Sequence, residues 1–398
     1  MDEHILFELG VAIALVAAAG LIAYKLRFSV VPFYIIVGML VGPHAPQLGP
    51  VDLRFIQSDD LIMIMGQMGV VFLLFYLGLE FSVDRLQKAG RSILVAGSIY
   101  LAINFSLGLL FGWIGGFSFK EILVVAGITT ISSSAIVAKV LMDLKRAGNP
   151  ETELILGTTL FEDVFLAVYL SILSGLILSG ATSFGGVLLS ALLALGYMLL
   201  ILFIGRKAVP LLNRALNITS NEVFILVIFA LLLLIAGFSE TIHVAAAIGA
   251  LLVGLIIAET EHMKRIEKMI LPFRDFFGAL FFFSFGLSID PTTLGDALWL
   301  SLGAVLVTLI GANVAGLLAG RSAELSSKAS TNIGLTLMAR GEFSIIVANL
   351  GSAGGLSSIL QPFTALYVLI MAMLTPILAK ESKRIYQGIR KISGVGKR

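Results

Sequence analysis

The chain has 398 residues, of which 58% are hydrophobic and only 13% are charged, with a formal net charge of +2. Soluble proteins carry about 25% charged residues, so this composition leaves too little charge for the water-exposed surface of a soluble domain. Soluble enzymes and nucleic-acid-binding proteins are therefore excluded, and no nucleic-acid partner is expected. The chain has no cysteine, which excludes disulfides, thiolate metal sites and cysteine nucleophiles.

Long apolar segments follow one another from end to end of the chain. A helix needs about 20 largely apolar residues to cross the hydrocarbon core of a bilayer. We predict an all-α polytopic membrane protein with about thirteen transmembrane helices. The predicted segments are 5–24, 29–43, 62–80, 92–114, 121–143, 154–178, 185–208, 222–238, 244–259, 271–288, 296–319, 330–352 and 361–379.

The basic residues are distributed unevenly between the two ends of these segments. Most of the 27 Lys and Arg residues fall in alternate connections and in the C-terminal tail, whereas the opposite connections hold only Arg54 and Lys120. Connections rich in Lys and Arg stay in the cytoplasm. We therefore expect a multi-pass protein of the cell membrane, with the N-terminus outside and the C-terminus in the cytoplasm.

The start of each predicted segment and the start of the segment seven places later in the series are separated by a nearly constant number of residues. This offset predicts two six-helix halves, and because seven is odd, the second half enters the membrane in the opposite direction. Inverted repeats of this kind are typical of transporters that work by alternating access. The alternative is that regular helix spacing in any polytopic protein produces a similar offset. The predicted division is a first repeat over 1–184, a linker helix over 185–210, a second repeat over 211–380 and a basic tail over 381–398.

Two segments in matching positions of the two halves have polar interruptions at their centres. Segment 121–143 contains Thr130, Ser132 and Ser133, and segment 330–352 contains Arg340 and Glu342. Interrupted helices in matching positions point to the binding site of a transporter. Two crossing broken helices bring helix ends of like polarity together, so we expect Arg340 and Glu342 to compensate those partial charges. The alternative for the hydroxyl residues is ordinary helix–helix packing.

Glu162 and Asp163 lie in the middle of the apolar segment 154–178. An acid at the centre of a membrane helix costs roughly 2.5–3.5 kcal/mol, so such a residue usually has a function. A single carboxylate can hold a proton or a monovalent cation in turn, and Thr159 shares the helix face of Asp163. We expect the ion and proton site here, with Thr130, Ser132 and Ser133. The alternative is a buried ion pair with Arg340, which is the favoured role for Glu162.

Asn313 and Asn349 are further polar residues within predicted spans. They could line the ion path, but helix packing explains them equally well. No His, Asp or Glu spacing suggests a metal centre other than a monovalent cation at Asp163, and no cofactor is expected.

Four motifs resemble those of the cation:proton antiporter-2 family of monovalent cation:proton antiporters. The resemblance covers nearly the whole chain, and the four motifs follow one another in the family's order. They are the third-helix stretch 69–80, the ion-site sequence Phe161-Glu162-Asp163, the stretch 279–290, and Gly341-Glu342-Phe343 on the second broken helix.

This resemblance implies the sodium/proton antiporter fold, with a core that moves like an elevator against a dimer domain, and a homodimer. It also implies exchange of a monovalent cation for protons, with Asp163 as the binding carboxylate. Many family members have a Lys on the eleventh helix, where this chain has Asn313, so the resemblance leaves open whether exchange is electrogenic. The chain also resembles the membrane subunit of Bacillus-type potassium/proton antiporters. That similarity implies a separate soluble regulatory subunit with a ligand-binding regulator-of-potassium-conductance C-terminal domain.

The favoured function is export of K⁺, with Na⁺ as another substrate, against inward protons. A sodium/proton antiporter and a ligand-gated potassium efflux channel are the nearer alternatives. An intramembrane protease is a remote alternative, because an aspartyl type needs two facing aspartates and only Asp163 lies in mid-membrane. We therefore expect a transporter and not an enzyme.

Overall fold

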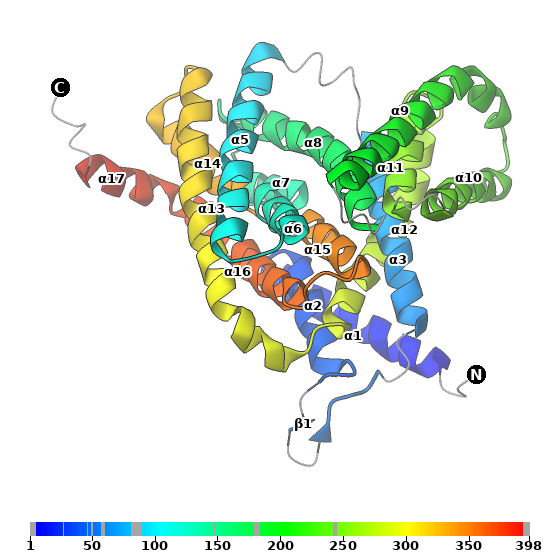
Figure 1. Ribbon diagram of the computed structural model, residues 1–398, viewed down its shortest axis with the longest axis horizontal. Coiled ribbons are helices and arrows are strands. Elements are labelled where there is room, and N and C mark those ends of the chain that lie inside the picture. Colours follow the sequence, from blue (N-terminus) through cyan, green and yellow to red (C-terminus); the bar gives the residue numbers. More distant parts are fainter. Residues whose placement is uncertain are drawn as a thin grey trace.

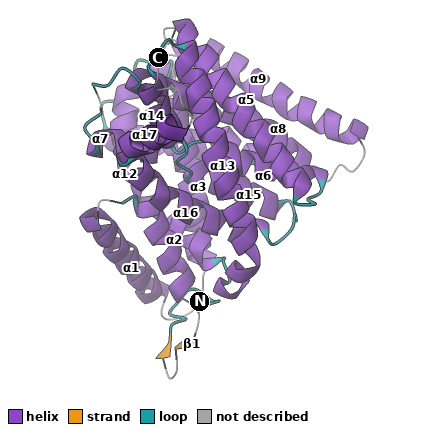
Figure 2. Cartoon of the chain, turned by 90° about the vertical axis from the view of Figure 1, so that its left-hand side faces the viewer, coloured by secondary structure: helices purple, strands orange, loops and turns teal. Residues whose placement is uncertain are grey.

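The computed structural model describes residues 5–26, 28–45, 47–48, 51–56, 60–80, 90–146, 148–178, 184–241 and 245–392. These residues form a bundle of helices with one small β-hairpin, which projects beyond the helices (Figures 1 and 2). The hairpin pairs β1 (Gln47–Leu48) with β2 (Val51–Asp52) in antiparallel register.

The first half of the chain contains α1 (Ile5–Leu26), α2 (Val30–Val41), α3 (Asp60–Glu80), α5 (Gly90–Ile114), α6 (Phe119–Thr130), α7 (Ser134–Asp143), α8 (Thr152–Leu178) and α9 (Phe184–Ala215). The second half contains α10 (Asn221–Thr241), α11 (Ala246–Ile257), α12 (Met263–Leu287), the 3-10 turn η1 (Pro291–Thr293), α13 (Leu294–Ser322), α14 (Ser327–Leu337), α15 (Glu342–Ala353), α16 (Leu360–Lys380) and α17 (Ser382–Ile392).

Serine side chains cap the helices that matter most for the site. Ser118 and Glu121 form a capping box at the start of α6, in which the Ser118 amide donates to Glu121 Oε2 at 2.9 Å. Ser133 caps α7, and Ser326 caps α14 by accepting from the Ala329 amide at 3.2 Å. Each cap gives a partner to a backbone N–H that the helix itself leaves unpaired.

The predicted count of thirteen spans is not confirmed. Among the described residues, ten helices are long and apolar enough to cross a membrane, or eleven if the bent pair α14–α15 counts as one span. Helices α2 and α11 are apolar but have only 12 residues each, which is about 18 Å of helix against a hydrocarbon core of about 30 Å. All thirteen predicted segments nevertheless coincide with a helix or a pair of helices.

The helices form two bundles. The core bundle contains α5 to α8 and α13 to α16, and the scaffold bundle contains α1 to α3 and α10 to α12. The helix α9, near the predicted linker 185–210, packs against α8 of the core and α11 of the scaffold. Figure 1 shows α9 and α10 along one side of the molecule, whereas α17 leaves it on the opposite side.

Two close helix crossings in the scaffold bundle occur at glycines. A Cβ at Gly38 of α2 would lie 2.3 Å from the Phe283 carbonyl oxygen of α12, and one at Gly254 of α11 would lie 2.2 Å from that of Phe75 of α3. Small residues allow membrane helices to approach this closely. The residues that face the two glycines are Phe283 and Gly286 on α12, and Phe75 and Gly78 on α3. The number of residues between Phe75 and Phe283 equals the number between Gly78 and Gly286. The predicted inverted repeat requires such matched crossings, and the repeat itself stays a prediction.

The predicted orientation also stays a prediction. Of the basic residues on which it depends, Arg27, Arg85, Lys88, Lys397 and Arg398 lie outside the described residues.

The glycine crossings generate a stability prediction. Gly254→Ala is expected to destabilise the protein by about 1–3 kcal/mol, because the added methyl group overlaps the α3 backbone. Gly10→Ala on α1 is the matched control, since a Cβ there has no neighbour within 4 Å. Thermal unfolding of the detergent-solubilised protein measures both. An unfolding temperature for Gly254→Ala equal to that of Gly10→Ala would contradict the close crossing.

Candidate functional site

The two broken helices cross in the centre of the core bundle. The first break separates α6 from α7 at residues 131–133, and the second separates α14 from α15 at 338–341 with a bend of 41°. Backbone and side chain join the breaks directly: the Ser133 amide donates to the Ala339 carbonyl at 2.9 Å, and the Ser132 hydroxyl donates to the Leu337 carbonyl at 2.6 Å. Irregular backbone at membrane depth is thereby satisfied within the protein.

Arg340 lies against the carbonyl ends of both broken helices. Its side chain is fully buried, with Nε 2.9 Å from the Thr129 oxygen of α6 and Nη1 2.9 Å from the Leu337 oxygen of α14. Nη1 also donates to the Ala339 carbonyl at 3.0 Å. The carboxyl end of a helix carries a partial negative charge, so a guanidinium placed there is stabilising.

Glu342 lies at the opposite, amide ends of the crossing. It is the first residue of α15, it is buried, and its Oε2 accepts from the Ser133 hydroxyl of the α7 cap at 2.8 Å. The backbone amides of Ala135 and of Glu342 itself also donate to this carboxylate. Arg340 and Glu342 therefore occupy the positions that the helix-end argument assigns to them, and their part in transport stays a prediction.

Helix α8 passes the crossing and contacts α6, α7, α14 and α15. Glu162 on α8 is fully buried, and its Oε2 accepts from the Ser132 amide at 3.4 Å. The Arg340 charge acts on Glu162, but Nε and Nη1 of Arg340 donate to carbonyl oxygens. Asp163 is 8% exposed, next to Glu162 on a different side of the helix, since neighbouring residues differ by about 100° around the axis.

The predicted hydroxyl residues are all buried near this crossing, but they differ in their partners. Thr130 and Thr159 donate within their own helices, to Ala126 at 2.6 Å and to Leu156 at 2.8 Å. Ser132 and Ser133 join the two breaks instead. A hydroxyl that donates to a carbonyl keeps its oxygen lone pairs available for a cation.

A cavity of about 780 Å³ lies between the two bundles. We call it the Glu240 cavity; its lining includes Gln67, Glu240, Ser284 and Asn349, with the rest mostly apolar. On α8 its described lining begins at Leu170, two turns beyond Asp163. Of the two asparagines that the sequence suggested for the path, Asn349 lines this cavity. Asn313 instead donates to the Leu309 carbonyl of its own helix at 2.7 Å.

Sequence reasoning missed several polar residues of the crossing. The Ser344 hydroxyl donates to the Ile128 carbonyl at 2.7 Å and adds a third link between the broken helices. Tyr100 and Tyr367 act electrostatically on Arg340, and the Tyr367 hydroxyl lies 2.6 Å from that of Thr308. A single Tyr or Ser in an apolar span gives little signal, although Ser344 follows Glu342 by only two residues.

Two broken helices that cross beside a membrane-buried carboxylate are the architecture of a secondary transporter. The chain matches the family described as sodium/hydrogen exchanger, transmembrane, over residues 11–380. It belongs to this family.

Known proteins resemble the chain along nearly its whole length. It is 66% identical to the K(+)/H(+) antiporter subunit KhtU of Bacillus subtilis (strain 168), covering 98% of this chain and 96% of that protein. It is 29% identical to the ammonium/H(+) antiporter subunit AmhT of Alkalihalophilus pseudofirmus, covering 93% and 91%. The sodium proton antiporter MjNhaP1 of Methanocaldococcus jannaschii has the same fold, with a TM-score of 0.63 at 17% identity over 99% of this chain and 100% of that one.

The burial of Arg340 generates a second stability prediction. Arg340→Ala is expected to destabilise the protein by about 3 kcal/mol or more, because the buried Thr129 carbonyl loses its guanidinium donor and the carbonyl ends of two helices lose the positive charge that compensates them. Arg206→Ala is the control, since that side chain is 55% exposed and pairs with Glu259 at the surface. Thermal unfolding in detergent measures both. Equal unfolding temperatures for the two variants would contradict the role assigned to Arg340 at the crossing.

Proposed function

We propose that the chain is the membrane subunit of an antiporter that exchanges K⁺ for protons, with Na⁺ as a further substrate. The observation that carries this proposal is a carboxylate, Asp163, buried beside two broken helices whose end charges are compensated within the protein. The resemblance to an antiporter subunit for K⁺ and protons favours K⁺ as the cation.

The proposed mechanism uses one site for two competing ligands. A cation bound at Asp163 is held by the carboxylate and by oxygen atoms of the crossing, with Thr130, Ser132, Ser133 and Thr159 as the candidate ligands. A proton that binds Asp163 removes the negative charge and releases the cation. Because the carboxylate is neutralised in either loaded state, movement of the site across the membrane does not carry an unpaired buried charge.

In this mechanism Asp163 binds the transported ion, while other residues compensate the helix ends. Arg340 and Glu342 already neutralise the partial charges of the crossing, so the Asp163 charge is available for the transported ion. Glu162 contacts the Ser132 amide and is assigned to holding the crossing together.

We propose that the antiporter works with a second, regulatory protein and as a homodimer. The word subunit in the names of two relatives supports a second protein, which we infer to be a soluble regulatory subunit that binds a ligand. A homodimer is proposed from the family resemblance. The excess of Lys and Arg on one face supports a cytoplasmic C-terminus and an external N-terminus.

Asp163→Asn is expected to abolish cation-dependent proton movement without loss of folding, because the amide has the same shape but can exchange neither ligand. Proteoliposomes with an internal pH indicator and an imposed K⁺ or Na⁺ gradient measure this. Asp143→Asn is the control, since that acid is exposed and forms a surface ion pair with Lys139 at 3.4 Å.

Two results would contradict the proposal. The first is normal exchange by Asp163→Asn protein that elutes as a folded species. The second is K⁺ flux through the unaltered chain without any proton flux, which would indicate a channel.

A further inference from the structure

The boundary between the core and scaffold bundles, which we call the seam, is open at one end and closed at the other. Helix α16 reaches both ends: Gln361 near its start lines the Glu240 cavity, whereas Pro376 lines a gap of only about 40 Å³. The 15 residues from one to the other correspond to about 22 Å of helix. The gap at the closed end lies between Ser29, the N-cap of scaffold helix α2, and Val140 of core helix α7, which is 2% exposed.

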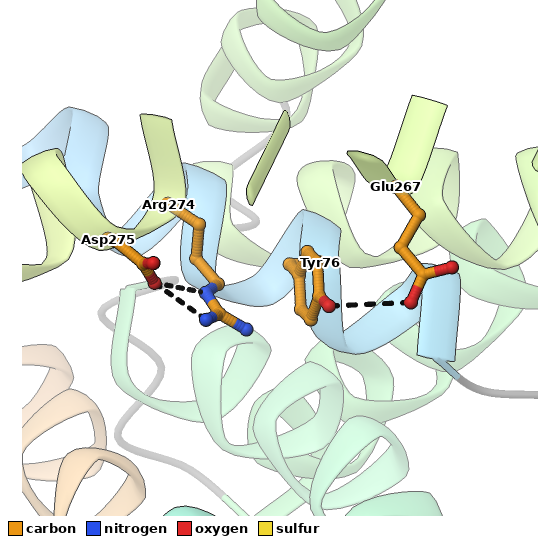
Figure 3. Close-up of polar contacts among 4 residues, drawn as sticks. All are labelled: Tyr76, Glu267, Arg274 and Asp275. Atoms are coloured by element: carbon orange, nitrogen blue, oxygen red, sulfur yellow. Dashed lines mark hydrogen bonds and ion pairs between the residues drawn. The ribbon is translucent and has the colours of Figure 1, made fainter. Parts of the chain in front are cut away.

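Polar side chains of the scaffold pair with one another, as Figure 3 shows for α3 and α12. The Tyr76 hydroxyl donates to Glu267 Oε1 at 3.4 Å. The Arg274 guanidinium lies 2.6 Å from Asp275 Oδ1 and 4.1 Å from the centre of the Tyr76 ring. The bonds that join the two broken helices likewise stay within the core. A hydrogen bond between the bundles has a different effect, because it ties the position of one bundle to that of the other.

Such a bond joins Ser174 of core helix α8 to the start of scaffold helix α11. The Ala245 amide donates to Ser174 Oγ at 2.8 Å, and the Ser174 side chain is fully buried. Ala245 is the N-cap of α11. In a capping box the amide of the N-cap is bound by the side chain at the third helical position, which here is Ile248 and cannot accept a hydrogen bond. The Ser174 hydroxyl therefore supplies, from the other bundle, a partner that α11 itself does not provide.

Ser174 lies on the same face of α8 as Asp163. The 11 residues from one to the other make about three helical turns, or about 17 Å along the axis. Leu170 lies between them on this face and lines the Glu240 cavity, and all three residues are buried. The face of α8 that carries Asp163 is therefore the face turned toward the seam.

Helix α8 is continuous over 27 residues, so a displacement of Asp163 along the seam displaces Ser174 as well. A hydrogen bond of 2.8 Å is lost when its donor and acceptor move about 1 Å further apart. Any step that moves the carboxylate relative to the scaffold by more than this distance breaks the bond between Ser174 and the Ala245 amide.

We propose that Ser174 is a positioning residue for transport. Its bond to the Ala245 amide holds α8, and Asp163 with it, in the position in which the seam is open at the Glu240 cavity and closed at Val140. This inference rests on the proposed antiport function, in which the site is reached from the two ends in turn. Removing the hydroxyl takes away a stabilisation of this position, and the population with the opposite end open rises about two- to tenfold.

The absence of cysteine from the chain makes the proposal testable, because a single introduced thiol reports the opening of one end. Val140→Cys places a thiol at the closed end, where a hydrophilic maleimide reacts only while that end is open. Gln67→Cys places one in the Glu240 cavity. In the purified full chain, Ser174→Ala is expected to speed the modification of Val140→Cys about two- to tenfold and not to speed that of Gln67→Cys.

Ser171→Ala is the matched control on the same helix. The Ser171 hydroxyl is also buried, but it donates to the Ala167 carbonyl of α8 at 2.9 Å and to Met198 Sδ of α9 at 3.4 Å. This variant removes a buried hydroxyl without removing a bond to the scaffold. It is expected to leave the modification rates of both introduced cysteines unchanged.

Faster modification of Val140→Cys alone, in Ser174→Ala and not in Ser171→Ala, supports the proposal. An unchanged rate overturns it, as does equal acceleration at both cysteines, which indicates general loosening of the fold. Failure of the antiport function is distinguishable, because the unaltered chain would then show no K⁺-dependent proton flux. If only the positioning role fails, that flux remains and the rate at Val140→Cys does not respond to Ser174→Ala.

Discussion

The structure depends on the compensation of two chain breaks in the middle of an apolar bundle. Each break leaves backbone groups without helical partners and exposes helix ends with partial charges, in an environment with no water to solvate them. Arg340 meets the carbonyl ends of α6 and α14, and Glu342 meets the amide ends of α7 and α15. With both compensated inside the protein, the crossing can exist, and the proposed mechanism leaves the Asp163 charge for the transported ion.

The mostly apolar Glu240 cavity lies between the two bundles, on one side of this crossing. The scaffold itself depends on the glycine crossings of α2 with α12 and of α11 with α3, where backbones touch without side chains between them. In the proposed alternating-access mechanism, this scaffold is the surface against which the core moves.

The sequence predicted the main features of the fold because membrane burial makes polar residues conspicuous. The polar interruptions at Ser132 and at Arg340 predicted both breaks, and each predicted segment coincides with a helix or a helix pair. The span count is not confirmed at α2 and α11, whose apolar runs suggest spans although their helices have only 12 residues. Tertiary detail was beyond the sequence: nothing in composition or spacing indicates that Ser344 reaches Ile128, that Asn313 bonds to its own helix, or that Tyr76 stacks on Arg274.

The central claim is that a cation and a proton compete for Asp163. The most direct measurement is proton release from purified, weakly buffered protein when K⁺ or Na⁺ is added, followed with a pH indicator. At a pH low enough that Asp163 is protonated before the cation is added, we expect about one proton released per cation bound by the unaltered chain, and neither binding nor release by Asp163→Asn. Cation binding without proton release, or release that persists in Asp163→Asn, would contradict it.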